Sequence, residues 1–148
     1  MFKLMLKGMI STTIFLYRLT GGAIGGRMKT IGFLLLTTIG RKSGQTRTVP
    51  LAFLRDGSDY VIIASNAGLP QNPAWFLNLK SHPDATVQVK RQHIQVKAET
   101  ANPEKRRELW ARLMEVAPGY GRYQKRTPRE TPVVILHSLD GSGEEQSA

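Results

Sequence analysis

Two short apolar runs joined by a glycine-rich, basic stretch constrain the fold of this chain more than any other feature. The first run covers residues 31–39 (IGFLLLTTI) and the second covers residues 48–54 (TVPLAFL). Both are rich in Leu, Ile, Val, Thr or Phe and are bounded by Gly or charged residues, which is typical of β-strands. The connection, residues 40–47 (GRKSGQTR), has the composition of a tight turn. The stretch therefore predicts a β-hairpin.

The composition of this turn is consistent with two roles. A tight connection with two glycines and three cationic side chains can direct backbone N–H groups, Arg41 and Lys42 toward one anion. An ordinary solvent-exposed turn uses the same residue types, so the segment alone leaves both roles open. It is not a P-loop, because the position five residues before Gly40 is Leu35 and Arg41 stands between Gly40 and Lys42.

The rest of the chain continues in short strands and helices. Residues 60–65 and 132–136 are apolar enough for buried strands, and residues 85–89 and 94–98 alternate as a second hairpin. Asn72 and Asn102, each followed by proline, are expected to cap two helices. The second helix should bury Leu109, Trp110, Leu113 and Met114 and turn Lys105, Arg106 and Arg107 outward. The order predicts an α+β, mainly antiparallel fold: a six-stranded, barrel-like sheet with peripheral helices.

Positive charge is concentrated in the first part of the chain. The sequence has 21 Lys and Arg against 11 Asp and Glu, and no acidic residue precedes Asp56. Such an excess implies an anionic partner, which could be nucleic acid, anionic lipid or a small anionic molecule. Nucleic acid is not expected, because the aromatic residues are not interleaved with the basic ones. The chain has no cysteine and three widely spaced histidines, so no metal site is expected. The absence of cysteine is also consistent with a reducing compartment.

The chain is expected to form one folded domain between two terminal segments. Residues 1–30 should comprise an amphipathic helix over residues 1–20 and a glycine-rich connector, residues 31–139 the barrel, and residues 140–148 a disordered tail. The longest uncharged stretch of the first segment is shorter than the roughly 20 residues that span a bilayer. Packing on the domain is favoured for the helix, and binding to an anionic membrane surface is the alternative.

Four segments together resemble the deazaflavin (F420)-dependent nitroreductase family. They read LLLTTIGRKSGQTRTVPLAFLRDG, VIIASNAG, NPAWFLNLKSHPDATVQV and YGRYQKRTPRETPVVIL, and the similarity covers residues 16–136. The resemblance implies a split β-barrel that transfers a hydride from reduced coenzyme F420 to a quinone, enone or nitro-type acceptor. The alternatives are an FMN-dependent split-barrel reductase and a non-catalytic carrier of the cofactor or a fatty acid. A monomer or homodimer is expected from the resemblance. The expected location is the cytoplasm, with the inner face of the cell membrane as an alternative.

The resemblance also assigns the site residues. The basic turn would hold the anionic tail of the cofactor, and a second set of residues would line the deazaflavin ring or face it from the middle helix. Two tyrosines would position the acceptor and donate a proton to it. The cofactor residues are Arg41, Lys42, Ser43, Gly44, Arg47, Pro50, Ala64, Ser65, Asn66, Asn72, Trp75 and Asn78, and the catalytic ones are Tyr120 and Tyr123. The simpler roles are core packing for Trp75 and closure of the barrel mouth for the tyrosines.

Three positions depart from the pattern that the resemblance leads one to expect. Ala52 stands where an aromatic residue is common, Asn66 where lysine is frequent, and Ala117 where tyrosine is frequent. These changes should enlarge the acceptor pocket and make it less polar. A bulkier acceptor, such as a menaquinone, is therefore expected to fit at least as well as a nitroimidazole.

Overall fold

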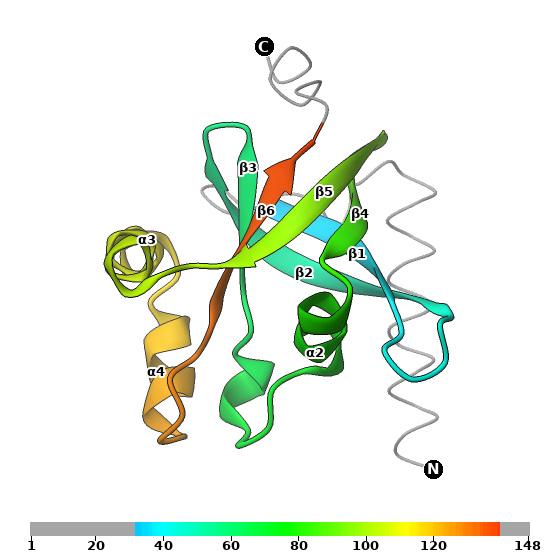
Figure 1. The fold of residues 1–148 in the computed structure, drawn as a ribbon. Coiled ribbons are helices and arrows are strands. Elements are labelled where there is room, and N and C mark those ends of the chain that lie inside the picture. Colours follow the sequence, from blue (N-terminus) through cyan, green and yellow to red (C-terminus); the bar gives the residue numbers. More distant parts are fainter. Residues whose placement is uncertain (1–31, 140–148) are drawn as a thin grey trace.

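Six antiparallel strands close into a barrel in the computed structural model, which describes residues 32–139 (Figure 1). The strand order around the barrel is β1-β2-β3-β6-β5-β4, and β1 also pairs with β4. This architecture confirms the predicted six-stranded α+β barrel. Its elements are β1 (Gly32–Ile39), β2 (Thr46–Asp56), β3 (Asp59–Ile63), the 3-10 turn η1 (Asn66–Gly68), α2 (Ala74–Ser81), β4 (Asp84–Val89), β5 (Gln92–Thr100), α3 (Pro103–Val116), α4 (Gly119–Lys125) and β6 (Val133–Ser138).

The first hairpin forms where the sequence predicts it. β1 and β2 pair without interruption from the Ile39–Thr46 pair to the Gly32–Phe53 pair. Glycine at the start of the turn allows a close approach of the backbone, because a Cβ on Gly40 would lie 3.0 Å from the carbonyl oxygen of Gln45. Gly44 has a φ of 72°, in the left-handed region that glycine adopts without strain. Both glycines therefore suit the backbone conformation of this turn.

The barrel interior is filled by alternate residues of the strands. Ile94 and Val96 of β5 are buried, whereas their neighbours Gln95 and Lys97 are exposed. α2 adds its own apolar residues to the same core and lies below the barrel in the view of Figure 1. The buried members of this core are Leu34, Leu36, Tyr60, Ile62, Ala64, Trp75, Phe76, Leu79, Ala85, Val87, Ile94, Val96, Val134 and Leu136.

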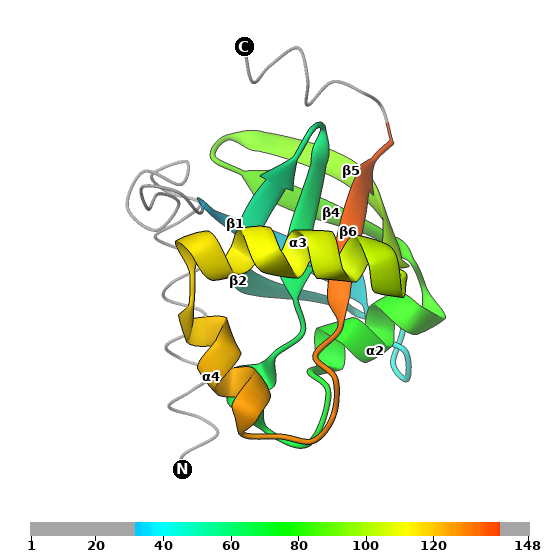
Figure 2. The ribbon, with the colours of Figure 1, turned by 90° about the vertical axis from the view of Figure 1, so that its left-hand side faces the viewer.

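A second, smaller core lies outside the barrel under α3. Leu109 of α3 packs there with Leu54, Val61, Val133 and Ile135, which come from β2, β3 and β6. Figure 2 shows α3 crossing the outer face of these strands. The helix begins as predicted, because the side chain of Asn102 accepts a hydrogen bond of 2.9 Å from the backbone N–H of Lys105.

Two local predictions are wrong. Asn72 does not cap α2, whose N-cap residue is Pro73; the Asn72 side chain instead accepts a hydrogen bond from Arg129. Arg106 does not face solvent, since its side chain is only 17% exposed and its guanidinium donates twice to the carbonyl of Thr131. In both cases a partner far away in the sequence outcompetes the local preference.

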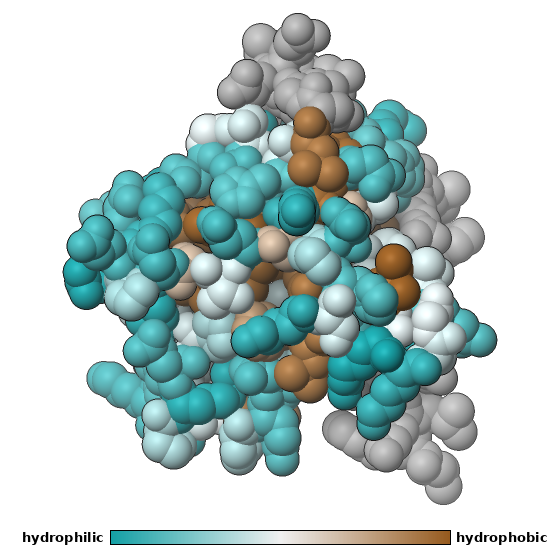
Figure 3. Space-filling model, viewed as in Figure 1, coloured by the Kyte–Doolittle hydropathy of each residue, from teal (hydrophilic) through white to brown (hydrophobic). Residues whose placement is uncertain are grey.

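The predicted terminal segments, residues 1–30 and 140–148, lie outside the described residues. Within residues 32–139, no helix is long and apolar enough to cross a membrane. Polar side chains cover most of the face shown in Figure 3, and apolar residues appear on it only in separate places.

Candidate functional site

The basic turn between β1 and β2 presents its cationic side chains to solvent. Arg41, Lys42 and Arg47 are all exposed. Within residues 32–139, neither Lys42 nor Arg47 forms an ion pair. The backbone N–H of Gln45 donates to the hydroxyl oxygen of Ser43 across 3.2 Å, which fixes that side chain over the turn. The turn thus offers the ammonium group of Lys42 and the guanidinium group of Arg47 to an anion.

Asn78 connects this turn to the body of the protein. Its side-chain oxygen accepts hydrogen bonds from the backbone N–H and the guanidinium of Arg41, at 3.1 and 3.2 Å. Its amide donates to the hydroxyl of Thr38 at 3.1 Å, and the residue is 4% exposed. Asn78 therefore orients Arg41 and ties α2 to the end of β1. A direct contact of Asn78 with a cofactor stays a prediction.

The segment after β3 carries the residues expected at the ring of the cofactor. Ala64 and Ser65 are buried, and Asn66 adopts a left-handed φ of 47°. The amide of Asn66 donates to the carbonyl of Gln71 across 2.9 Å, which closes a compact loop. In Figure 1 this loop and η1 lie at the same lower end of the barrel as α2 and the basic turn.

The two predicted tyrosines lie together on α4, which packs against η1. Their rings meet edge to face with centroids 6.0 Å apart. A Cβ on Gly68 of η1 would lie 2.8 Å from the carbonyl oxygen of Tyr123, so glycine allows this close approach. Burial, and to a lesser extent the neighbouring Tyr123, raises the pKa of the Tyr120 phenol. Tyr120 is therefore protonated at neutral pH and is suited to donate a hydrogen bond or a proton.

Two other predicted residues occupy different surroundings. Trp75 is 7% exposed and its ring meets that of Phe76 edge to face, so it is part of the barrel core. Pro50 is half-buried and pairs with Leu35 in the middle of the hairpin. Its neighbours Val49 and Leu51 pack on the interior core, so the alternation of the strand places Pro50 on the outer face. Cofactor contacts by both residues stay predictions.

Arg129 is a residue of this region that the sequence did not single out. Its guanidinium donates to the carbonyls of Ala64, Ser65 and Leu69 and to the side chain of Asn72. The only signal in the sequence is its place in the last of the four segments that carry the family resemblance. Nothing local distinguishes it from the neighbouring basic residues.

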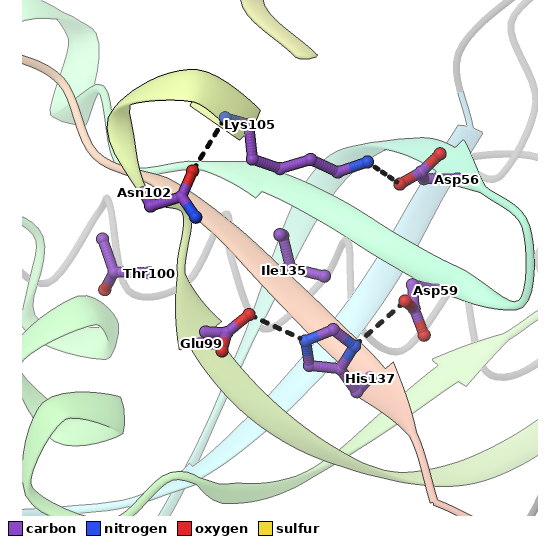
Figure 4. A pocket seen from close by; sticks show the side chains of 8 residues that line it. All are labelled: Asp56, Asp59, Glu99, Thr100, Asn102, Lys105, Ile135 and His137. Carbon is purple, nitrogen blue, oxygen red and sulfur yellow. Dashed lines mark hydrogen bonds and ion pairs between the residues drawn. The ribbon is translucent and has the colours of Figure 1, made fainter. Parts of the chain in front are cut away.

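A cavity of about 390 Å³ lies on the outside of the barrel, between the N-terminal end of α3 and the sheet (Figure 4). Lys105 and Arg112 form ion pairs with Asp56 at 3.1 and 2.9 Å. Burial opposes ionisation of Asp56, but these two cations outweigh it and lower the pKa of the carboxyl. No predicted site residue lines this cavity. Its lining residues are Asp56, Asp59, Glu99, Thr100, Asn102, Lys105, Ile135 and His137.

His137 joins three strands at the edge of this cavity. Its ring nitrogens lie 3.0 Å from a carboxylate oxygen of Asp59 and 3.2 Å from one of Glu99. Burial opposes protonation, but the two carboxylates outweigh it, so the pKa of His137 is raised above its ordinary value of 6.5. Within residues 32–139, no group of three or more His, Asp or Glu side chains is arranged to hold a metal ion.

Replacing His137 with glutamine should therefore reduce thermal stability at acidic but not at alkaline pH. Because the folded-state pKa is raised, the stabilisation by protonated His137 is complete below about pH 6.5 and disappears as the pH rises through the raised value. Melting temperatures measured from pH 5.5 to 9 should differ by about 2–5 °C at the acidic end and converge above neutral pH. The exposed His93 changed to glutamine is the control; a difference that does not vary with pH would contradict the assignment.

Comparisons with known proteins identify the family. A family model described as F420H(2)-dependent quinone reductase matches residues 10–138. An F420H(2)-dependent quinone reductase of Mycobacterium tuberculosis (strain H37Rv) is 40% identical over 127 residues, which is 82% of this chain and 84% of the relative. A second protein of that strain, named as a putative F420H(2)-dependent quinone reductase, is 33% identical and covers 75% of this chain and 93% of its own.

Solved structures agree with these relatives. A structure of an F420-H2 dependent reductase (FDR-A) has a TM-score of 0.66 and 33% identity, and the match covers 78% of this chain and all of that one. A structure described as a domain-swapped dimer has a TM-score of 0.69 and 30% identity, covering 86% of this chain and 95% of the other. The haem storage protein HutZ of Vibrio cholerae, at 12% identity and a TM-score of 0.57, shares the fold alone. The expected kinship with F420-dependent split-barrel reductases is confirmed: this chain belongs to the F420H(2)-dependent quinone reductase family.

Proposed function

We propose that the protein reduces a quinone with hydride from coenzyme F420, bound at the end of the barrel that carries the basic turn. The observation that carries the proposal is the grouping of the turn, η1 and the tyrosine pair of α4 at that end (Figure 1), in a chain of this family. The acidic side chains of Asp56 and Asp59 lie at the β2–β3 turn, away from the basic turn at the other end of β2.

The donor set of the basic turn fits an anionic cofactor tail. Lys42 and Arg47 are exposed without ion-pair partners among the described residues, and Asn78 holds Arg41 in place. Charge-assisted hydrogen bonds from such groups to phosphate or carboxylate oxygens are about twice as strong as neutral ones. In this proposal Arg41, Lys42, Ser43, Gly44 and Arg47 bind the tail, and the loop from Ala64 to Asn66 lines the ring.

The tyrosine pair is placed on the acceptor side. A quinone takes up a hydride, which reduced F420 supplies, and a proton to give the quinol. Tyr120 remains protonated at neutral pH, so its phenol can donate a hydrogen bond to a quinone oxygen. Tyr123 holds the Tyr120 ring edge to face and offers a second phenol.

Changing Tyr120 to phenylalanine should lower kcat for quinone reduction by about tenfold or more, because general-acid contributions are typically at least that large. The affinity for F420 should change little, since the phenol is not assigned to the cofactor. The measurement is F420H2 oxidation followed by absorbance with a menaquinone analogue, at saturating cofactor. If Tyr120→Phe and Tyr123→Phe both keep the full rate, the tyrosines only close the barrel mouth.

As the alternative to packing on the domain, residues 1–20 are proposed to associate with an anionic membrane surface, with the protein in the cytoplasm. Their apolar and basic side chains and the insolubility of long-chain quinones in water support this arrangement. Flotation with vesicles containing anionic lipid tests it, and absence of the full-length protein from the floated fraction would refute it.

Similarity to a structure described as a domain-swapped dimer favours a homodimer for this chain, which light scattering measures directly.

A further inference from the structure

Arg129 makes more hydrogen bonds to the loop after β3 than any of the residues predicted for the site. Its Nε donates to the carbonyl of Leu69 at 3.1 Å, and its Nη2 donates to the carbonyl of Ser65 at 2.9 Å. Its Nη1 donates to the carbonyl of Ala64 at 3.2 Å and to the side-chain oxygen of Asn72 at 2.8 Å. One side chain thus holds both ends and the middle of the segment from Ala64 to Asn72.

This loop begins where the backbone hydrogen bonds of the sheet end. The ladder between β3 and β6 ends at the Ile63–Val133 pair, and the N–H of Ala64 makes a last backbone bond to Pro132. Beyond that point the sheet no longer supplies a partner for the carbonyl of Ala64, and a buried carbonyl without a partner is costly. The carbonyl of Ser65 also accepts a hydrogen bond of 2.9 Å from the N–H of Gly68 inside the loop, so Arg129 is its second donor. The planar guanidinium fork reaches several acceptors at fixed angles, which a lysine ammonium cannot do.

The backbone of Arg129 is also held by hydrogen bonds. Its backbone carbonyl accepts from the side-chain amide of Gln124 at 2.7 Å, and its N–H donates to the hydroxyl of Thr127. The side-chain oxygen of Gln124 also accepts from the N–H of Thr131 at 2.8 Å, and the guanidinium of Arg106 donates to the carbonyl of Thr131. α3 and α4 therefore fix the base of Arg129 while its tip fixes the loop.

We propose that Arg129 is a positioning residue for cofactor and acceptor. It connects the segment expected at the deazaflavin ring with the chain that follows α4, the helix of Tyr120 and Tyr123. This connection would keep the distance between the ring-lining loop and the tyrosines constant. The proposal rests on the proposed function, because the ring-lining role of Ala64, Ser65 and Asn66 belongs to it. Arg129 itself contacts neither reactant and acts through the loop.

The test compares Arg129→Lys with Arg106→Lys. The Arg106 variant breaks hydrogen bonds to Thr131 and Gln124 in the same network but none to the loop. Both variants should lose thermal stability. Only Arg129→Lys should weaken F420 binding by about tenfold or more and slow cofactor oxidation in a single turnover with F420H2 already bound. Its salt dependence of binding should equal that of the wild type, because no contact with the anionic tail is lost. The exposed Arg107→Lys serves as the neutral control.

Amide hydrogen exchange separates this proposal from the proposed function. Arg129→Lys should lose protection at residues 64–72, whereas Arg106→Lys should keep it. Equal protection in both variants, or unchanged binding and single-turnover rate in Arg129→Lys, would overturn the proposal. If the wild type fails to bind F420 while Arg129→Lys still loosens the loop selectively, the proposed function fails and the control of the loop by Arg129 stands.

Discussion

Replacing Lys42 and Arg47 together with alanine is expected to weaken F420 binding by about 100-fold or more. A hydrogen bond to a charged group contributes about 1.5–3 kcal/mol, and each 1.4 kcal/mol is about tenfold in affinity. Both side chains are exposed and make no ion pairs within residues 32–139, so their loss should leave the fold intact. Titration of the cofactor fluorescence at two salt concentrations measures the effect. The variant should also show the weaker salt dependence.

The matched control is the double variant Arg91→Ala and Lys97→Ala. It removes the same number of positive charges, one from the exposed β4–β5 turn and one from β5. If this control weakens binding as much as the turn variant does, net charge rather than a local site attracts the cofactor. A parallel titration with FMN distinguishes the cofactors. Binding of FMN without any response to F420 would redirect the site assignments to an FMN-dependent reductase.

Replacing Trp75 with alanine is expected to destabilise the protein by about 3–5 kcal/mol, as is usual for removal of a buried tryptophan. Trp75 is 7% exposed and belongs to the core that joins α2 to the barrel interior. The loss should also disturb Asn78, three residues later on the same helix, and through it the orientation of Arg41. Urea denaturation at constant pH measures the change in the free energy of unfolding.

Trp110 provides the comparison for this prediction. It is only half-buried on α3, where the guanidinium carbon of Arg106 lies 4.8 Å from the centroid of its ring. Trp110→Ala should therefore cost clearly less stability than Trp75→Ala. If instead Trp75→Ala leaves stability nearly unchanged and abolishes cofactor binding, the tryptophan is a cofactor contact rather than a core residue.

Local patterns in the sequence predicted most of the fold. Alternation identified the second hairpin, and the glycines of the GRKSGQTR turn identified the first. Asn102 before proline marked the start of α3. These features depend on residues that are close together in the chain, so their local conformational preferences can be recognised from the sequence. The resemblance to a family then supplied the candidate site residues.

The contacts that organise the candidate site could not be predicted in this way. Arg129 donates to Ala64 and Asn72, which precede it by 65 and 57 residues, and Asn78 accepts from Arg41 across 37 residues. No local pattern distinguishes these partners from other polar residues. The sequence by itself therefore determined the strands, their turns and the concentration of positive charge. Only the closed barrel decided which carbonyls were left without a strand partner, and which arginine donates to them.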